Sequence, residues 1–184
     1  MKTILITVIL ILLSLNCYSE EYSRIVHFGG WIDTDNDGQD TRQEVLERDS
    51  LIPVGYNSFG KINYGLWLCQ YTGRLFIDPV KLDIDHRVPL KEAFISGGES
   101  WSEEKRIKYA NYLGKNYHLV VVEAKSNREK GAKDIAVWLP EIRVREYIFA
   151  WALVKEKWNL CFDWEEVKIL SKYRVLVDNV CEEK

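Results

Sequence analysis

The apolar run near the amino terminus restricts this chain most, because it decides which part of the sequence is left to fold. After the positively charged start Met1-Lys2-Thr3, residues 4–15 are almost entirely apolar. A run of about a dozen such residues matches a signal-peptide core and is shorter than the roughly 20 residues of a membrane span. The small residue Ser19 suits a cleavage site. We therefore expect residues 1–19 to be a signal peptide and a secreted or periplasmic protein to begin at Glu20.

The cysteines leave open a second fate for the leader and allow one cross-link in the remaining chain. Cys17 offers a lipoprotein anchor as the alternative, although Ser14-Leu15-Asn16 is a poor lead-in to a lipidated cysteine. After cleavage Cys69, Cys161 and Cys181 remain, and an export route permits at most one internal disulfide among them. A bond between Cys161 and Cys181 would tie down the carboxyl-terminal tail. No Cys-X-X-Cys or His/Cys cluster occurs, so no structural zinc site is expected.

The size and composition of residues 20–184 fit one folded domain. About 165 residues are enough to enclose a real hydrophobic core. A hydrophobic content of 47% with seven tryptophans argues against disorder. The formal net charge of −3 argues against a nucleic-acid partner, but Lys81–Arg145 carries 13 basic and 10 acidic residues. This locally basic middle fits a phosphate-facing surface in an otherwise acidic protein.

Apolar spacing, turn residues and capping patterns predict short strands interspersed with helices. Strands are expected at residues 65–70, 74–77, 82–88, 118–123 and 173–177. Helices are expected at residues 41–48, 100–113, 126–131, 143–158 and 164–171. The second helix has a capping-box pattern at Ser100-Trp101-Ser102-Glu103. No membrane span is expected in the mature chain.

Three polar groups in the middle region could together carry chemistry: Asp83-Ile84-Asp85-His86 on a strand, Asn116 before the next strand, and Asn127-Arg128-Glu129-Lys130 at a helix start. Hydrolysis of a phosphodiester needs a base with a pKa near neutrality, which histidine supplies. It also needs a hard cation, for which Asp and Asn oxygens are suitable ligands. On a regular strand Asp85 and His86 point to opposite faces, so they share one site only if the strand ends or bends there.

These segments together resemble HNH nucleases. Residues 83–90 are similar to the first strand of such enzymes, residues 116–122 to the second strand with its central Asn, and residues 127–131 to the helix start that carries the last metal ligand. More narrowly, residues 83–140 are similar to a secreted HNH family related to the carboxyl-terminal domain of GmrSD-type restriction endonucleases. Residues 39–46 and 71–73 resemble the amino-terminal half of that family.

The sequence departs from the family pattern at three places. Gly38 stands where a cysteine is common, which puts one family-like disulfide in doubt, and Asn111-Tyr112 stands where Asn-Asp is common. The final ligand position holds Asn127 in place of His, a variant also found in HNH domains of RNA-guided nucleases.

The resemblance implies an α+β fold with a ββα-metal (HNH, His-Me finger) core at about residues 80–140. A helix is inserted between the two strands, a loop and strand extension precedes the core, and packing helices follow it. The implied activity is a metal-dependent endonuclease that hydrolyses phosphodiester bonds of DNA, or of RNA, with little sequence specificity.

Roles for individual residues follow from the same resemblance. His86 is expected to be the general base, oriented by Asn116. Asp85 and Asn127 are expected to hold one divalent ion, Mg²⁺ in the first place, with Mn²⁺ or Ca²⁺ as alternatives. The basic side chains expected to meet substrate phosphate are Lys130, Arg87, Arg128 and Arg42.

An acidic loop offers a different interpretation. The calcium-loop pattern D-x-D-x-D-G-x5-E is met at every specified position, and its acidic residues are Asp33, Asp35, Asp37 and Glu44. Asp40 stands where such loops usually have an apolar residue, and Phe28-Gly29-Gly30-Trp31 is no entering helix. The loop is either a structural calcium site or a polar loop whose aspartates cap their own backbone, with Arg42 bridging to them or reaching the active site. The alternative function is a noncatalytic secreted calcium-binding or adhesion module.

Overall fold

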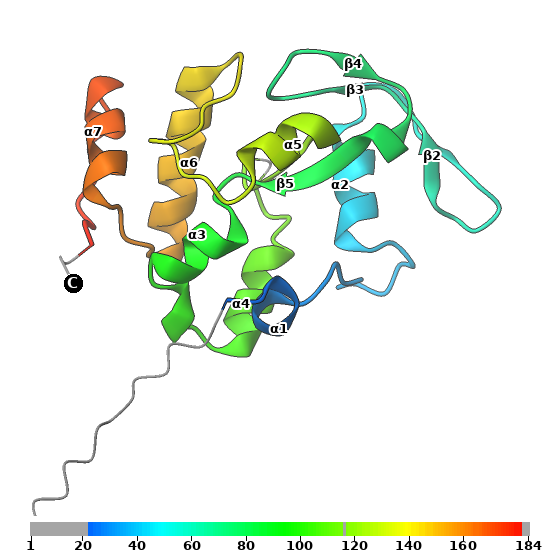
Figure 1. Ribbon diagram of the computed structural model, residues 1–184. Coiled ribbons are helices and arrows are strands. Elements are labelled where there is room, and N and C mark those ends of the chain that lie inside the picture. Colours follow the sequence, from blue (N-terminus) through cyan, green and yellow to red (C-terminus); the bar gives the residue numbers. More distant parts are fainter. Residues whose placement is uncertain (1–21, 116, 182–184) are drawn as a thin grey trace, which may run out of the picture.

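The computed structural model describes residues 22–115 and 117–181, which form a mixed fold of small sheets and several helices (Figure 1). Within these residues the helices are α1 (Arg24–Phe28), α2 (Thr41–Asp49), α3 (Leu90–Ile95), α4 (Glu103–Ala110), α5 (Ala124–Lys130), α6 (Val144–Trp158) and α7 (Trp164–Lys172). The strands are β1 (Gly55–Tyr56), β2 (Ile62–Tyr64), β3 (Trp67–Leu68), β4 (Leu75–Phe76), β5 (Leu82–His86) and β6 (Leu119–Glu123). Short 3₁₀ turns are η1 (Pro79–Lys81) and η2 (Gly98–Ser100).

The centre of the molecule is the antiparallel pair β5–β6. Its register pairs Leu82 with Glu123 and His86 with Leu119. Strand β6 is rich in β-branched residues, which suit a pleated, half-buried surface, whereas β5 alternates Leu82 and Ile84 with Asp83 and Asp85. The chain between them forms α3, η2 and α4, and α5 follows β6 directly and lies across the pair (Figure 1).

The two faces of this pair belong to different hydrophobic clusters, because successive side chains on a strand point to opposite sides. Leu82 and Ile84 join the smaller cluster, which contains residues of α2. Val120 and Val122, which pair with Asp85 and Asp83, join the larger cluster. The acidic residues of β5 therefore lie on the face of the hairpin that α5 covers, while His86 lies on the other.

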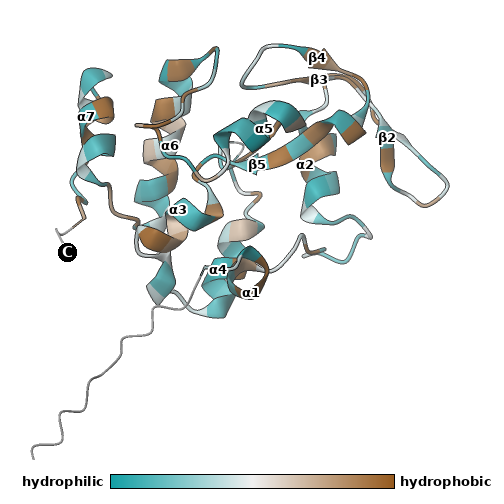
Figure 2. Cartoon of the chain, in the orientation of Figure 1, coloured by the Kyte–Doolittle hydropathy of each residue, from teal (hydrophilic) through white to brown (hydrophobic). Residues whose placement is uncertain are grey.

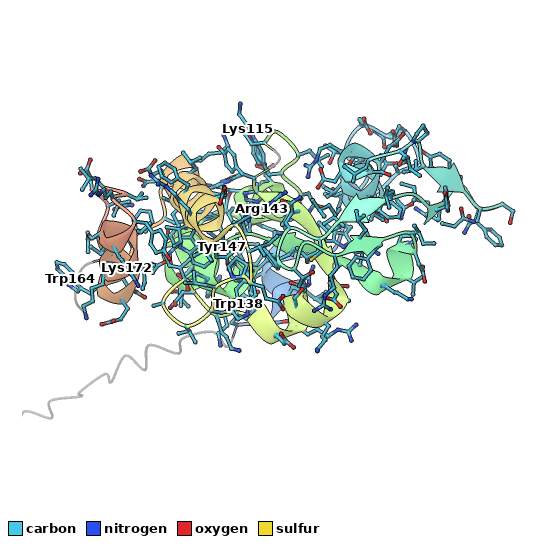
Figure 3. All side chains as sticks on the ribbon, turned by 90° about the horizontal axis from the view of Figure 1, so that it is seen from above. Lys115, Trp138, Arg143, Tyr147, Trp164 and Lys172 are labelled. Atoms are coloured by element: carbon cyan, nitrogen blue, oxygen red, sulfur yellow. A yellow bond between two sulfur atoms is a disulfide. The ribbon has the colours of Figure 1, made fainter. Side chains whose placement is uncertain are left out.

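The carboxyl-terminal helices complete the larger core. Trp138 and Tyr147, labelled in Figure 3, lie beside each other with ring centroids 5.7 Å apart. Trp164 lies on α7 at the edge of the molecule and is 56% exposed (Figure 3). The structure decides the cysteine pairing that the sequence left open: Cys161 and Cys181 are bonded, while Cys69 is a buried free thiol.

Several predicted elements are confirmed, with shifts at their ends. The hairpin β3–β4, the strands β5 and β6, and the helices α2, α5, α6 and α7 lie where the patterns place them. The predicted strand at 173–177 is wrong, since these residues form a turn and an irregular segment. The helix predicted from Ser100 begins at Glu103, because Ser102 is its N-cap and accepts a hydrogen bond from the Lys105 amide.

Some elements carry no clear sequence signal. The short helices α1 and α3 and the pair β1–β2 were not predicted. Within the described part of the chain, no helix has the length and apolar character needed to cross a membrane.

Candidate functional site

A cleft of about 360 Å³ lies where β5, the start of α3, α5 and the amino-terminal segment meet. Its wall contains residues that the sequence singled out and residues that it did not. The lining residues used below are Tyr22, Arg24, Asp85, His86, Lys91, Asn127 and Arg128. Asp85 and His86 both reach this cleft although they leave the strand on opposite faces, because β5 ends at His86.

The hydrogen bonding of the His86 ring defines which of its two nitrogens carries the hydrogen. Its Nε2 lies 2.8 Å from the carbonyl oxygen of Ala110 at the end of α4. A carbonyl only accepts hydrogen bonds, so Nε2 carries the ring hydrogen and Nδ1 keeps the lone pair. No residue in 22–115 or 117–181 donates to Nδ1. Burial, chiefly, lowers the pKa of His86 well below 6.5, with nearby His118 also lowering it, so the ring is neutral at pH 7.

The aromatic face of His86 is covered by a tethered loop. The Trp31 ring stacks on the imidazole with centroids 5.3 Å apart and planes 7° apart. Asn111 holds the loop on both sides of this tryptophan: its Oδ1 accepts from the Ile32 amide at 3.1 Å, and its Nδ2 donates to the Gly30 carbonyl at 3.2 Å. The imidazole is therefore fixed by an aromatic stack and by one hydrogen bond.

Asp85 is held by a buried network. Lys130 Nζ lies 3.0 Å from Asp85 Oδ1 and 2.8 Å from Oδ2. The Tyr71 hydroxyl donates to Oδ2. Burial first, and then the Asp85 charge, raise the pKa of Tyr71 well above 10, so the phenol stays protonated and donates. Asp85 itself is only 6% exposed.

Lys130 does not occupy the position predicted for a phosphate contact. Its side chain is 0% exposed, and its ammonium also donates to the His86 carbonyl at 2.9 Å. Burial lowers the pKa of Lys130, while Asp85 acts in the opposite direction. A solvent-exposed phosphate cannot reach a group enclosed in this way, and this role for Lys130 is wrong in the described structure.

Asn127 lies within α5 rather than at its beginning. Since α5 starts at Ala124, Asn127 is not the helix cap. Its Nδ2 donates to Asp83 Oδ2 at 3.1 Å, which turns the amide so that Oδ1 remains an acceptor. Asn127 is half-buried and lines the cleft together with Asp85.

Two side chains that line the cleft carry oxygen atoms of the kind that bind hard cations. Asp85 Oδ1 accepts a single hydrogen bond, from Lys130, and so keeps a lone pair, and Asn127 contributes its amide oxygen. Carboxylate and amide oxygens are ligands that Mg²⁺, Mn²⁺ and Ca²⁺ accept. Asn116, predicted to orient the base, lies outside the described residues.

The predicted arginines divide between the cleft and other places. Arg128 is exposed and lines the cleft. Arg87 lies elsewhere, with its guanidinium 5.3 Å from the Tyr147 ring centroid and its Nε donating to the Tyr117 carbonyl. Arg42 donates to the carbonyls of Pro79 and Leu82, so it neither bridges the acidic loop nor lines the cleft. The predicted phosphate contacts of Arg87 and Arg42 are wrong in this structure.

Sequence reasoning missed the part of the cleft lining that comes from the amino-terminal segment and α3. Tyr22 comes just before α1, Arg24 is the first residue of α1, and Lys91 comes from α3. Arg24 and Lys91 are exposed, and Arg24 is close enough to help lower the pKa of His86, after burial and His118. No local motif marks these residues, because they approach the site only through the tertiary fold.

The acidic loop brings together three of its four predicted ligands, the aspartates. Carboxylate oxygens of Asp33, Asp35 and Asp37 lie within 4.8 Å of one another. Glu44 follows in the first turn of α2, and its Oε2 is buried with no hydrogen-bond partner in the described residues. Burial first, and then Asp35, Asp37 and Asp33, raise the pKa of Glu44.

Comparison with known proteins gives one informative relative. An uncharacterized secreted protein of Arthroderma benhamiae is 33% identical over 133 residues, which cover 71% of this chain and 64% of that protein. The chain therefore matches less than two thirds of the length of this relative. No protein-family model matches the chain, and no solved structure matches it significantly.

Proposed function

We propose that this protein is a secreted, metal-dependent endonuclease of the HNH type, in which β5, β6 and α5 form the ββα-metal core. The observation that carries the proposal is the cleft in which three features meet. His86 offers an Nδ1 lone pair, Asp85 and Asn127 offer oxygen ligands, and exposed cations stand at the rim. A noncatalytic scaffold has no physical need for this combination of groups in one cleft.

In the proposed reaction, His86 Nδ1 accepts a proton from a water molecule as the water oxygen attacks the phosphorus. The bond from phosphorus to the 3′ oxygen breaks, and that oxygen is protonated from solvent, leaving 5′-phosphate and 3′-hydroxyl ends. The Ala110 carbonyl holds Nε2–H and so keeps Nδ1 as the basic nitrogen throughout. A divalent cation held by Asp85 and Asn127 would supply Lewis-acid stabilisation of the phosphate and of the leaving oxygen.

The cleft favours a polyanionic substrate recognised by its backbone. Arg24, Lys91 and Arg128 all line the cleft, and all three side chains are exposed. Contacts to phosphate fix position without reading sequence. We therefore propose DNA, or RNA, as substrate, with little sequence specificity.

Export is part of the proposal. The amino-terminal apolar run predicts a signal peptide, and the Arthroderma benhamiae relative is described as secreted. A secreted or periplasmic location is also compatible with the Cys161–Cys181 disulfide, since such bonds persist in oxidising compartments.

The decisive test compares two buried histidines. His118 also bonds a carbonyl through Nε2, that of Tyr109 at 2.8 Å, but its Nδ1 is enclosed without a partner in the described residues and it does not line the cleft. We expect wild-type protein to nick plasmid with Mg²⁺ or Mn²⁺ and to be inert in EDTA. His86→Gln should lose about 10²- to 10⁴-fold in rate, the usual contribution of a general base, while His118→Gln should keep most of the activity.

Circular dichroism of both variants separates loss of chemistry from loss of fold. If folded His86→Gln cleaves as fast as His118→Gln, His86 is not the base. If wild-type protein is inert towards single- and double-stranded DNA and RNA with every metal tried, the nuclease proposal fails.

The convergence of Asp33, Asp35 and Asp37 beside the unpartnered Glu44 oxygen favours a second candidate function, calcium binding by the acidic loop. In that case Ca²⁺ should raise the melting temperature of wild-type protein. Asp35→Asn should abolish the rise, while Asp178→Asn, a change at an exposed aspartate elsewhere, should preserve it. If Asp35→Asn loses the calcium response but keeps nuclease activity, the loop holds a structural ion separate from the proposed active site. If Asp35→Asn keeps the calcium response of wild-type protein, the loop is not the calcium site.

A further inference from the structure

Among residues 22–115 and 117–181, Lys130 and Lys155 are the lysines with fully buried side chains, and each has a distinct set of partners. Lys155 pairs with Glu92 at 2.7 Å and Glu166 at 2.6 Å, linking α6 to α3 and α7. Lys130 pairs with Asp85 and donates to the backbone of His86, beside the cleft. An ammonium group is expensive to bury and is tolerated where its hydrogen bonds are satisfied. The position of Lys130 therefore requires an explanation that the phosphate role no longer supplies.

The partners of Lys130 are the two residues that the proposed reaction depends on. Its Nζ lies 2.8–3.0 Å from the Asp85 carboxylate oxygens and 2.9 Å from the His86 carbonyl oxygen. The side chains of Asp85 and His86, neighbours on a strand, point in opposite directions. Lys130 contacts both residues because it bonds the side chain of Asp85 and the backbone carbonyl of His86. One ammonium group thus fixes the end of β5.

Lys130 also connects this strand end to the other oxygen ligand. Asn127 and Lys130 are three residues apart on α5, so they occupy the same helix face. Asn127 donates to Asp83 and Lys130 donates to Asp85, two residues on one face of β5. The two bonds set the helix against the strand and determine the separation of the amide oxygen from the carboxylate.

On this basis, and resting on the proposed function, we propose that Lys130 is a positioning residue that orients Asp85 and the His86 backbone for metal binding and catalysis. Tyr71 is the second anchor, since its hydroxyl donates to Asp85 Oδ2 and leaves Oδ1 as the oxygen with the free lone pair. Groups that orient a metal ligand typically affect metal affinity or activity by about 10- to 100-fold.

The experiment uses the two buried lysines as a matched pair. Lys130→Met and Lys155→Met each remove a fully buried ammonium from an ion pair, so both should lower the melting temperature. We expect Lys130→Met alone to weaken Mn²⁺ binding, measured by calorimetry on the whole protein, by about 10- to 100-fold, and to lower kcat at saturating metal. The Mn²⁺ binding that is lost in Asp85→Asn is the binding that belongs to this site.

A second pair of variants keeps the proposal falsifiable if Lys130→Met does not fold. Tyr71→Phe removes only the hydroxyl that contacts Asp85, and Tyr147→Phe removes the hydroxyl of a neighbouring buried tyrosine that bonds the Arg87 carbonyl. Tyr71→Phe should weaken Mn²⁺ binding, and Tyr147→Phe should not.

The outcomes separate this inference from the function on which it rests. If wild-type protein is active and both lysine variants bind Mn²⁺ with equal affinity, the positioning role alone is overturned. Where Lys130→Met does not fold, equal Mn²⁺ affinity in the two tyrosine variants leads to the same conclusion. Wild-type protein that neither cleaves nucleic acid nor binds Mn²⁺ in an Asp85-dependent manner overturns both.

Discussion

At the scale of the residue, the environment of a side chain decides its chemistry more than its type does. His86 and His118 are both buried and both bond a carbonyl through Nε2, yet only His86 lines the cleft. Burial, in the first place, lowers the pKa of His118 to about 4 and that of His86 well below 6.5. Both rings are neutral at pH 7, so the contrast between them depends on access rather than on charge.

The exposed arginines that line the cleft, Arg24 and Arg128, lead to a prediction about nucleic-acid binding. Arg24→Ala and Arg128→Ala should each weaken binding of a DNA oligonucleotide in EDTA, because each removes one phosphate contact. The slope of log affinity against log salt should fall in magnitude by about 1 for each lost contact. Fluorescence anisotropy across a salt series measures both quantities. Arg145→Ala, at an exposed position on α6 outside the cleft, is the control, and identical slopes in all three variants would contradict this substrate path.

At the scale of the element, polar contacts on buried faces set how the helices dock. Figure 2 shows α5 as almost wholly hydrophilic, and yet Ala124, Ser126 and Lys130 are buried against the hairpin. Helix α6 is fixed to α3 and α7 by Lys155 with Glu92 and Glu166, and the Trp151 indole donates to Glu166 at 2.6 Å. Hydropathy alone cannot reveal a helix face that is buried through ion pairs.

The Lys155 network predicts a pH effect on stability. Burial, as the largest cause, raises the pKa of Glu166 from 4.5 to about 7, although Lys155 lowers it and Glu92 raises it further. Between these two values the folded protein holds a proton that the unfolded chain releases, so this group's contribution to stability is lost as pH rises from 4.5 through 7. Relative to Glu166→Gln, wild-type protein should lose on the order of 1–3 kcal/mol of unfolding free energy between pH 5 and pH 8.

Urea unfolding at both pH values measures this difference. The exposed neighbour Glu165, changed to Gln, is the control on the same helix turn. A constant gap between wild-type protein and Glu166→Gln across this range would show that Glu166 is already ionised in the folded protein at pH 5.

At the scale of the whole molecule, the sequence predicted which segments form the centre and which polar residues belong near it. The β-branched run before Glu123 and the Pro89 stop fixed two strands, and Gly131, with φ +55°, ends α5 where the pattern placed a break. Counting cysteines allowed at most one internal disulfide and left its partners open, and the structure shows that Cys161 and Cys181 form it. The prediction failed at residues 173–177, where β-branched and aromatic composition favoured a strand. These residues form a turn and an irregular segment, and the described residues after them make a β-bridge only at Val180, with Phe162.

The resemblance to HNH nucleases implied that Asp85, His86 and Asn127 belong to one site, whereas what the sequence by itself determined is local: strand and helix periods, caps and turns. These follow from interactions between residues close in the chain. Only the tertiary structure decided that Lys130 is buried against Asp85, that Arg42 and Arg87 bond distant carbonyls, and that Arg24 reaches the cleft of His86. The physical reason is that a charged side chain has no intrinsic partner. Its role is fixed by burial and by whichever groups the fold brings within hydrogen-bond distance.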